Sequence, residues 1–142
     1  MVDLIRTGPR TFLGRNGRGD EVPIGPDDVP GHFRPGELLK LALAGCAGMS
    51  ADAVLSRRLG EGFGMRIEIA GDADREQNRY PEISERIELD LSGLDEAARE
   101  QLLLALDRAI AATCTVQRTV EAGARVRHEV ADPETADPGA RR

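Results

Sequence analysis

The sequence predicts an α+β fold, in which helices pack against antiparallel sheet. Three observations lead to this prediction. An uncharged run from Leu41 to Ala51 lies inside one long helical segment. Residues 65–70, and the second half of residues 83–91, alternate apolar and charged residues with a period of two, as half-buried strands do. Residues 92–112 carry leucines and an isoleucine on one stripe with charges opposite, which is typical of a helix that covers a core.

The sequence of the first third of the chain predicts a hairpin that leads into the long helix. Residues 2–6 and 11–13 favour short strands, and 21–24 an edge strand, because Pro23 cannot donate to a central ladder. The turn between them contains Asn-Gly, a strong signal for a hairpin. Its glycines do not follow the dinucleotide-binding pattern, so nucleotide binding is not expected.

The long helix is predicted from Pro35 to Leu59, with Gly60 ending it. Proline suits the first helical position, and Glu37 in the first turn suits the positive end of the helix dipole. Two arginines in the last turn suit the negative end. Because the helix is apolar on nearly every side, we expect it to be enclosed by the fold.

The sequence after residue 91 predicts two helices followed by a last strand. Ser92 is the expected N-cap of the amphipathic helix, and a short helix to Glu121 follows Cys114. Residues 124–130 alternate as a final strand would. Residues 131–142, with their Asp-Pro pairs, read as a disordered tail, which leaves residues 1–130 as a single domain.

Composition narrows the classes of function. A net charge of −6 argues against nucleic-acid binding, which needs a basic face for phosphates. The uncharged run is about half the length of a membrane span, and the first residues do not resemble a signal peptide. The expected compartment is the cytoplasm, where thiols stay reduced. With only His32 and His128 beside two cysteines, we expect neither a metal nor another cofactor.

The two cysteines are the candidate reactive groups. Cys46 lies in the middle of the apolar helix, where a small buried core thiol is the simpler interpretation. Cys114 falls at the expected start of the short helix, where the helix dipole favours a thiolate. In a reducing compartment two cysteines are more often free or redox-active than a static crosslink.

Three separated motifs resemble the OsmC/Ohr family, the osmotically inducible and organic hydroperoxide resistance proteins. The first is Gly14-Arg15-Asn16-Gly17, similar to the family's Gly-Arg-Asp-Gly turn. The second is Pro35-Gly36-Glu37-Leu38-Leu39 leading to Ala44-Gly45-Cys46. The third is Cys114-Thr115-Val116, similar to the family's Cys-Pro-Val. The separation of the cysteines and the order of the elements also agree.

The resemblance implies an OsmC-like fold, with antiparallel sheets around a long central helix, and an intertwined homodimer with its reactive sites at the subunit interface. It also implies a thiol peroxidase without metal or flavin. Cys46 would attack an organic hydroperoxide and become a sulfenic acid, and Cys114 would resolve it as a disulfide. An external thiol or dithiol would then reduce the disulfide.

Arg15 and Glu37 complete the site that the resemblance implies. A thiol of ordinary pKa is only slightly ionised at neutral pH, so we expect Arg15 to supply a cation beside Cys46, held by a glutamate. Glu37 stands one position later than in the better-known peroxidases. On a regular helix it lies about 180° around from Cys46 and roughly 13.5 Å along the axis. Glu37 could therefore reach the Cys46 site only across a dimer interface or through an irregular helix start. The alternative is that Glu37 merely stabilises the helix N-terminus.

Two other functions compete with the peroxidase. The same fold could serve as a non-catalytic dimer that binds a small apolar ligand, which the shifted Glu37 favours. The cysteine pair could also act as a slow dithiol redox sensor.

Overall fold

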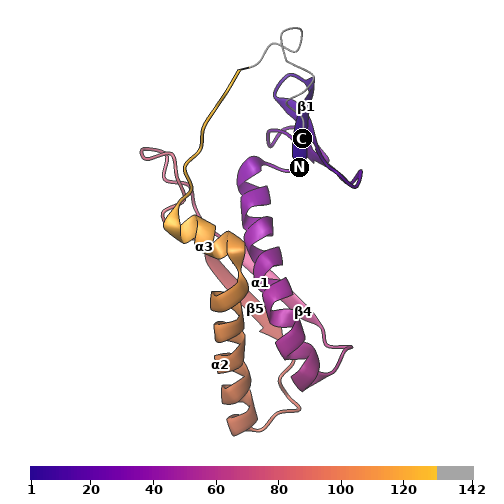
Figure 1. Ribbon diagram of the computed structural model, residues 1–142, viewed down its shortest axis with the longest axis vertical. Helices are drawn as coiled ribbons and strands as arrows, with labels where there is room; N and C mark the ends of the chain where they lie inside the picture. The colour runs from indigo at the N-terminus through magenta and orange to yellow at the C-terminus, as the bar shows by residue number, and fades with distance from the viewer. Residues whose placement is uncertain (131–142) are drawn as a thin grey trace, which may run out of the picture.

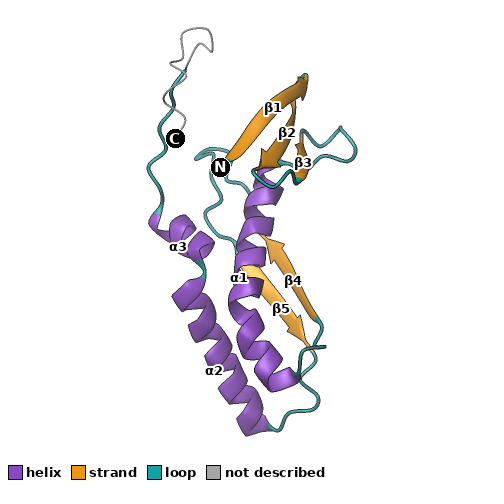
Figure 2. Ribbon diagram, turned by 45° about the vertical axis from the view of Figure 1, so that its right-hand side comes forward, coloured by secondary structure: helices purple, strands orange, loops and turns teal. Residues whose placement is uncertain are grey.

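The computed structural model describes residues 1–130 and shows two antiparallel sheets arranged along one long helix (Figures 1 and 2). The predicted α+β class is confirmed. The predicted tail, residues 131–142, lies outside the described residues.

The first sheet contains β1 (Val2–Gly8), β2 (Thr11–Asn16) and β3 (Glu21–Ile24), in the order β1-β2-β3. β2 runs further than the sequence indicated, because its residues 14–16 continue the ladder with β1. The turn therefore begins only after Asn16, whose side-chain Oδ1 accepts hydrogen bonds from the backbone N–H of Arg18 and Asp20. In Figure 2 this sheet sits at one end of the long helix.

The long helix, α1 (Pro35–Leu59), has the predicted bounds. Arg34 is its N-cap residue, and the carboxylate of Glu37 accepts the Arg34 backbone N–H at 2.9 Å. This bond satisfies a donor that the helix itself leaves free. Gly60 ends the helix with a positive φ of 90°, a conformation that residues with a side chain rarely adopt.

The second sheet pairs β4 (Met65–Ala70) with β5 (Ser84–Leu89). It lies against the C-terminal half of α1 (Figure 2). Gly48 permits this close packing, since a Cβ at that position would stand 3.3 Å from the end of the Met65 side chain. One face of the sheet is therefore half-buried, as the period-two pattern predicted.

Two further helices follow, α2 (Glu96–Thr113) and α3 (Thr115–Ala122). α2 runs beside α1 in both views, and the two helices enclose the core, which consists of Ala51, Leu55, Leu102 and Leu106 (Figures 1 and 2). The N-cap of α2 is Asp95, which accepts the Ala98 N–H at 2.8 Å. The expected cap, Ser92, instead donates its hydroxyl to Asp90 in the preceding turn.

The final strand expected at residues 124–130 is wrong. This segment leaves α3 as an exposed chain without strand pairing (Figure 2). Alternation of residues creates a strand only when another strand can complete its hydrogen bonds. Neither sheet of this chain extends to that segment.

The expectation that α1 would be fully enclosed is also wrong for a single chain. Leu41 is 48% exposed and Met49 is 83% exposed, although both lie in the uncharged run. By length and composition α1 would be apolar enough to cross a membrane, a criterion that the core helix of a folded protein also meets. Here it packs against α2, α3 and β4.

Candidate functional site

The two cysteines meet where α1 packs against the junction of α2 and α3. Cys46 projects from the middle of α1 and is partly exposed, whereas Cys114 is fully buried between the two later helices. Both thiols are free. The two thiols influence each other, since the Cys114 thiol helps to lower the pKa of Cys46. The fold thus joins two residues that stand far apart in the sequence.

Cys114 links the two helices. Its backbone N–H donates to the Ile110 carbonyl of α2 at 2.9 Å, and its Sγ accepts the Gln117 N–H of α3 at 3.5 Å. Its backbone is extended, with φ −71° and ψ 93°, which separates the two helices by one residue. Cys114 is therefore at once the C-cap of α2 and the N-cap of α3.

The start of α3 acts on Cys46. The pKa of Cys46 is lowered chiefly by a hydrogen bond from the Val116 backbone N–H, then by the Cys114 thiol and by the Thr115 N–H. These backbone groups have no acceptor within their own helix, so they are available to an anion. Cys46 is therefore the thiol more ready to ionise.

Cys114 has the opposite tendency. Burial raises its pKa more than the Gln117 N–H lowers it. The sequence had indicated that the helix N-terminus would favour a thiolate at Cys114, and this is wrong, because the effect of burial on its pKa outweighs that of the helix cap. The pair thus combines a thiol that ionises readily with one that stays protonated, so Cys114 must lose its proton before it can attack a sulfenic acid at Cys46.

A cleft of about 570 Å³ opens beside Cys46. The groups around it are mostly small or apolar, namely Ala42, Gly45, Met49, Ser50, Thr113 and Val116. Such a lining suits an apolar molecule approaching the sulfur.

Arg15 does not line this cleft. It lies in β2, where its Nε donates to the Glu21 carboxylate of β3 at 2.7 Å. Both side chains are nearly half exposed. Within one chain the lowered pKa of Cys46 arises from backbone donors instead of this guanidinium. A catalytic role for Arg15 stays a prediction.

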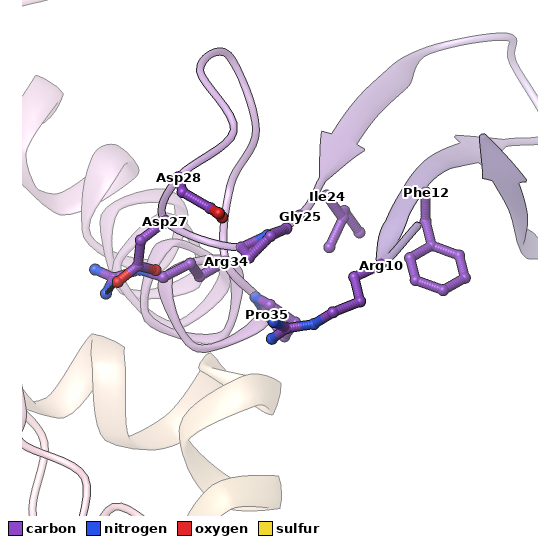
Figure 3. Close-up of a pocket in the computed structure, with 9 residues that line it drawn as sticks. Arg10, Phe12, Ile24, Gly25, Asp27, Asp28, Arg34 and Pro35 are labelled. Carbon is purple, nitrogen blue, oxygen red and sulfur yellow. Dashed lines mark hydrogen bonds and ion pairs between the residues drawn. The ribbon is translucent and has the colours of Figure 1, made fainter. Parts of the chain in front are cut away.

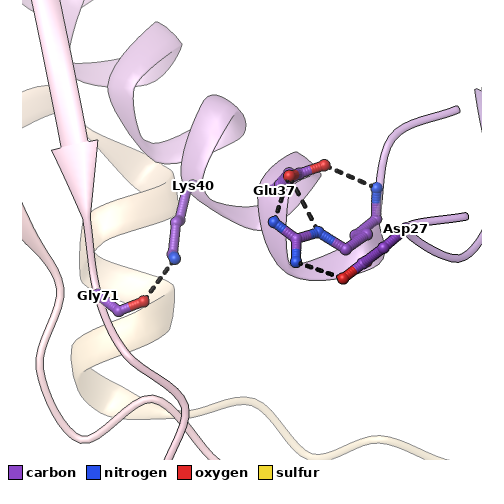
Figure 4. A network of polar contacts seen from close by, with 5 residues as sticks. Asp27, Glu37, Lys40 and Gly71 are labelled. Carbon is purple, nitrogen blue, oxygen red and sulfur yellow. Dashed lines mark hydrogen bonds and ion pairs between the residues drawn. The ribbon is translucent and has the colours of Figure 1, made fainter. Parts of the chain in front are cut away.

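Glu37 does not line the cleft beside Cys46 either. Its carboxylate holds the Arg34 guanidinium, which also contacts Asp27 at 3.1 Å (Figure 4). These hydrogen bonds from Arg34 lower the pKa of Glu37. One turn on, Lys40 donates to the Gly71 carbonyl and sits over the Tyr80 ring. This geometry fits the alternative role of Glu37 as a helix-N-terminal carboxylate, and its catalytic role also stays a prediction.

A larger hollow of about 740 Å³ lies near the N-terminus of α1, between the first sheet and the Asp27–Asp28 loop (Figure 3). Arg10, in the turn between β1 and β2, and Phe12 of β2 border it. Neither cysteine lines it, and Arg34 there is already paired with carboxylates. It offers no reactive group of its own.

Sequence reasoning missed one residue near the thiols, Glu85 of β5. The charge of Glu85 raises the pKa of both cysteines, so its carboxylate lies within electrostatic range of the pair. The signal was present in the sequence, because Glu85 occupies the position in the period-two pattern where Ile87 and Leu89 are apolar.

The chain is similar to one protein family and to two mycobacterial proteins. Residues 25–129 match the family model described as OsmC-like protein. The uncharacterized protein Rv2923c of Mycobacterium tuberculosis is 51% identical over 127 residues, which cover 89% of this chain and 93% of the relative. The uncharacterized protein Mb2948c of Mycobacterium bovis matches to the same degree.

Solved structures share the fold at low sequence identity. A hypothetical protein from Aquifex aeolicus is 22% identical with a TM-score of 0.67, over 86% of each chain. The OsmC-like protein VCA0330 of Vibrio cholerae is 13% identical with a TM-score of 0.67, over 85% of this chain and 92% of the other. The organic hydroperoxide resistance protein OhrB of Bacillus subtilis is 16% identical with a TM-score of 0.53, over 84% and 88%.

Proposed function

This chain belongs to the OsmC-like family, and on that premise we propose that it is a cysteine-based peroxidase that reduces organic hydroperoxides. One observation carries the proposal. Cys46, with a lowered pKa, shares a cleft with Thr113 and Val116, which flank Cys114, and the pKa of Cys114 is raised. A peroxidatic thiol must be ionised to attack, and its resolving partner must lie close by. The solved neighbour OhrB, named for organic hydroperoxide resistance, agrees with this reaction class.

The reaction has two steps within the protein. The Cys46 thiolate attacks one oxygen of the peroxide, the O–O bond breaks, and the alkoxide leaves as an alcohol after taking a proton. Cys46 becomes a sulfenic acid, oxidised by two electrons. The Cys114 sulfur then displaces the hydroxyl as water and forms a disulfide with Cys46. An external thiol or dithiol returns both residues to the reduced state, which suits a reducing compartment such as the cytoplasm.

The cleft beside Cys46 favours an organic substrate. Met49 and Val116 border it on opposite helices, and small residues keep it open between them. Binding in such a cleft is favourable for a substrate with an alkyl or aryl group, because that group leaves water. Hydrogen peroxide has no apolar surface to bury.

A homodimer is part of the proposal. Nearly every residue of β1 is exposed, and so are the apolar side chains of Leu41 and Met49 on α1. A second copy that covered these surfaces would remove them from water, the main driving force for association. It is also the route by which Arg15 and Glu37 would approach the cysteines, because within one chain they do not.

A second candidate function is the binding of a small apolar ligand without catalysis. A cleft of about 750 Å³ lies between the first sheet and α1, and its apolar lining includes Leu4, Val22, Ile24, Leu38 and Ala42. It holds neither cysteine. A ligand there would make the cysteine pair a secondary feature, or a slow redox sensor.

Peroxide consumption separates these candidates. The wild-type protein, supplied with cumene hydroperoxide and a dithiol, is expected to consume peroxide catalytically. Cys46→Ser should abolish consumption, and Cys114→Ser should leave a sulfenic acid at Cys46 that a carbon nucleophile traps. Undiminished consumption by Cys46→Ser would refute the peroxidase, and a wild type that binds apolar dyes without consuming peroxide would support the binding protein.

A further inference from the structure

Glu85 stands on the wrong face of its strand for a charged residue. In the second sheet Ile69 is paired with Glu85, and Ile67 with Ile87, so these side chains share one face. That face packs toward the core, because Ile87 and Leu89 contact the buried cluster. A carboxyl group therefore occupies a position that the pattern reserves for an apolar side chain.

The carboxyl group has an unused oxygen. Glu85 Oε1 is buried and has no hydrogen-bond partner among residues 1–130. The arginines of this sheet are engaged elsewhere, since Arg66 and Arg86 contact Glu88 on the other face. Buried carboxylates are normally paired, and an orphaned one lowers stability unless it serves another purpose.

The carboxyl group lies between the sheet and the helices that carry the thiols. It borders a cavity of about 550 Å³ that Leu43 of α1 and Gln117 of α3 also line. Leu43 and Gln117 are each three residues from a cysteine, Cys46 and Cys114 respectively. Burial raises the pKa of Glu85, which brings this carboxyl closer in basicity to a thiol.

The other charged groups around this cavity are few. Glu82 and Glu121 are acidic, and Glu121 accepts the Gln117 side-chain N–H at 2.8 Å. Arg79 donates to Gln77 at 2.6 Å. Among the described residues that line the cavity, Glu85 is the carboxyl with a buried, unpartnered oxygen.

We propose that Glu85 accepts the proton of the Cys114 thiol when the Cys114 sulfur attacks the oxidised sulfur of Cys46 and displaces the group bonded to it. This inference rests on the proposed function, in which the attacked group is the Cys46 sulfenic acid. The Glu85 carboxylate takes the Cys114 Sγ proton, the Cys114–Cys46 S–S bond forms, and the S–O bond of the sulfenic acid breaks. The leaving hydroxide takes the proton back from Glu85 and departs as water, so protons and electrons balance.

The environment of Cys114 explains why such an acceptor is needed. Its thiol is fully buried, so a base in solution cannot reach it directly. Its raised pKa keeps it protonated at neutral pH, whereas only the thiolate attacks. An internal carboxylate removes the proton at the moment of attack and leaves no stable thiolate beside Cys46.

A test without peroxide isolates this step. Ellman's reagent reaches the partly exposed Cys46 first and leaves a mixed disulfide, releasing one coloured thiolate. Attack by Cys114 then closes the intramolecular disulfide and releases a second, while the proton goes to Glu85. In Glu85→Gln the second release should be about 100-fold slower, the scale of general-base catalysis, while the first is not slowed. Glu82→Gln, which removes an exposed carboxyl at the same cavity, is the matched control and should behave as wild type.

The pH profile gives a second readout that a structural role would not produce. In the wild type the second release should fall as pH drops through the raised pKa of Glu85. In Glu85→Gln that inflection should vanish, and the rate should rise with pH as the Cys114 thiol ionises. A wild-type profile that follows only a thiol pKa would overturn the inference even if the variant failed to fold, and so would equal second-release rates in Glu85→Gln and wild type.

Failure of the inference and failure of the peroxidase look different. If the second release depends on Glu85 but cumene hydroperoxide is not consumed, the proton acceptor stands and the peroxidase does not. If peroxide is consumed and the second release ignores Glu85, the peroxidase stands and Glu85 has no part in it.

Discussion

Val116→Pro tests whether the start of α3 activates Cys46. The substitution removes one backbone N–H, the largest cause of the lowered pKa of Cys46, and keeps an apolar side chain of similar size. Val116 is the second residue of α3, where the N–H has no acceptor within the helix, so no helical hydrogen bond is lost. Because proline also disfavours the helical conformation of the preceding residue, Thr115, the far-ultraviolet circular dichroism of the variant must match wild type for the pKa to be interpreted.

The size of the effect follows from the lost bond. A hydrogen bond to a charged group contributes about 1.5–3 kcal/mol, and one pKa unit corresponds to about 1.4 kcal/mol. Because Cys46 is partly exposed, the lower end of this range applies. We expect the pKa of Cys46 to rise by about one unit.

The assay is an ultraviolet titration of the thiolate in a Cys114→Ser background. Serine keeps an oxygen that caps α3 and a hydroxyl that can donate to Cys46. Thr115→Pro is the matched control, since proline is favoured at the first helical position and the N–H it removes is the lesser backbone donor. An unchanged pKa in Val116→Pro, or a larger shift in Thr115→Pro, would refute the assignment of the activating group.

Three further predictions concern the core, the buried carboxyl and the first sheet. Leu55→Ala should lower the free energy of unfolding by about 2–5 kcal/mol in urea, because Leu55 is fully buried in the core; a negligible loss would contradict the described packing. Glu85→Gln should raise the melting temperature near neutral pH, where the ionised carboxyl destabilises the fold. This gain in stability should shrink as pH falls toward the ordinary carboxyl pKa, because the protonated carboxyl of Glu85 no longer destabilises the folded wild type. A gain that is independent of pH would count against this explanation. Arg15→Ala should change stability by less than about 1 kcal/mol, since its ion pair with Glu21 is exposed, yet slow peroxide consumption; undiminished consumption would remove Arg15 from the site.

The sequence by itself determined the elements that local chemistry controls. Proline at the start, glycine after the end and an uninterrupted apolar run set the bounds of α1, because these signals act within a few residues. Period-two alternation located β4 and β5 for the same reason. The three motifs around Arg15, Cys46 and Cys114 indicated the family, which the family match confirms.

Only the tertiary structure decided which groups meet. A period-two pattern at residues 124–130 could not make a strand without a neighbour, and Arg15 found Glu21 across its own sheet. The start of α3 activates Cys46 instead of Cys114, because burial of Cys114 outweighs its own helix cap. Glu85 is turned to the core face by the register of β5, and only the tertiary structure brings its charge within electrostatic range of both thiols. Such contacts join residues that are distant along the chain, so their energies depend on burial and geometry that no local pattern contains.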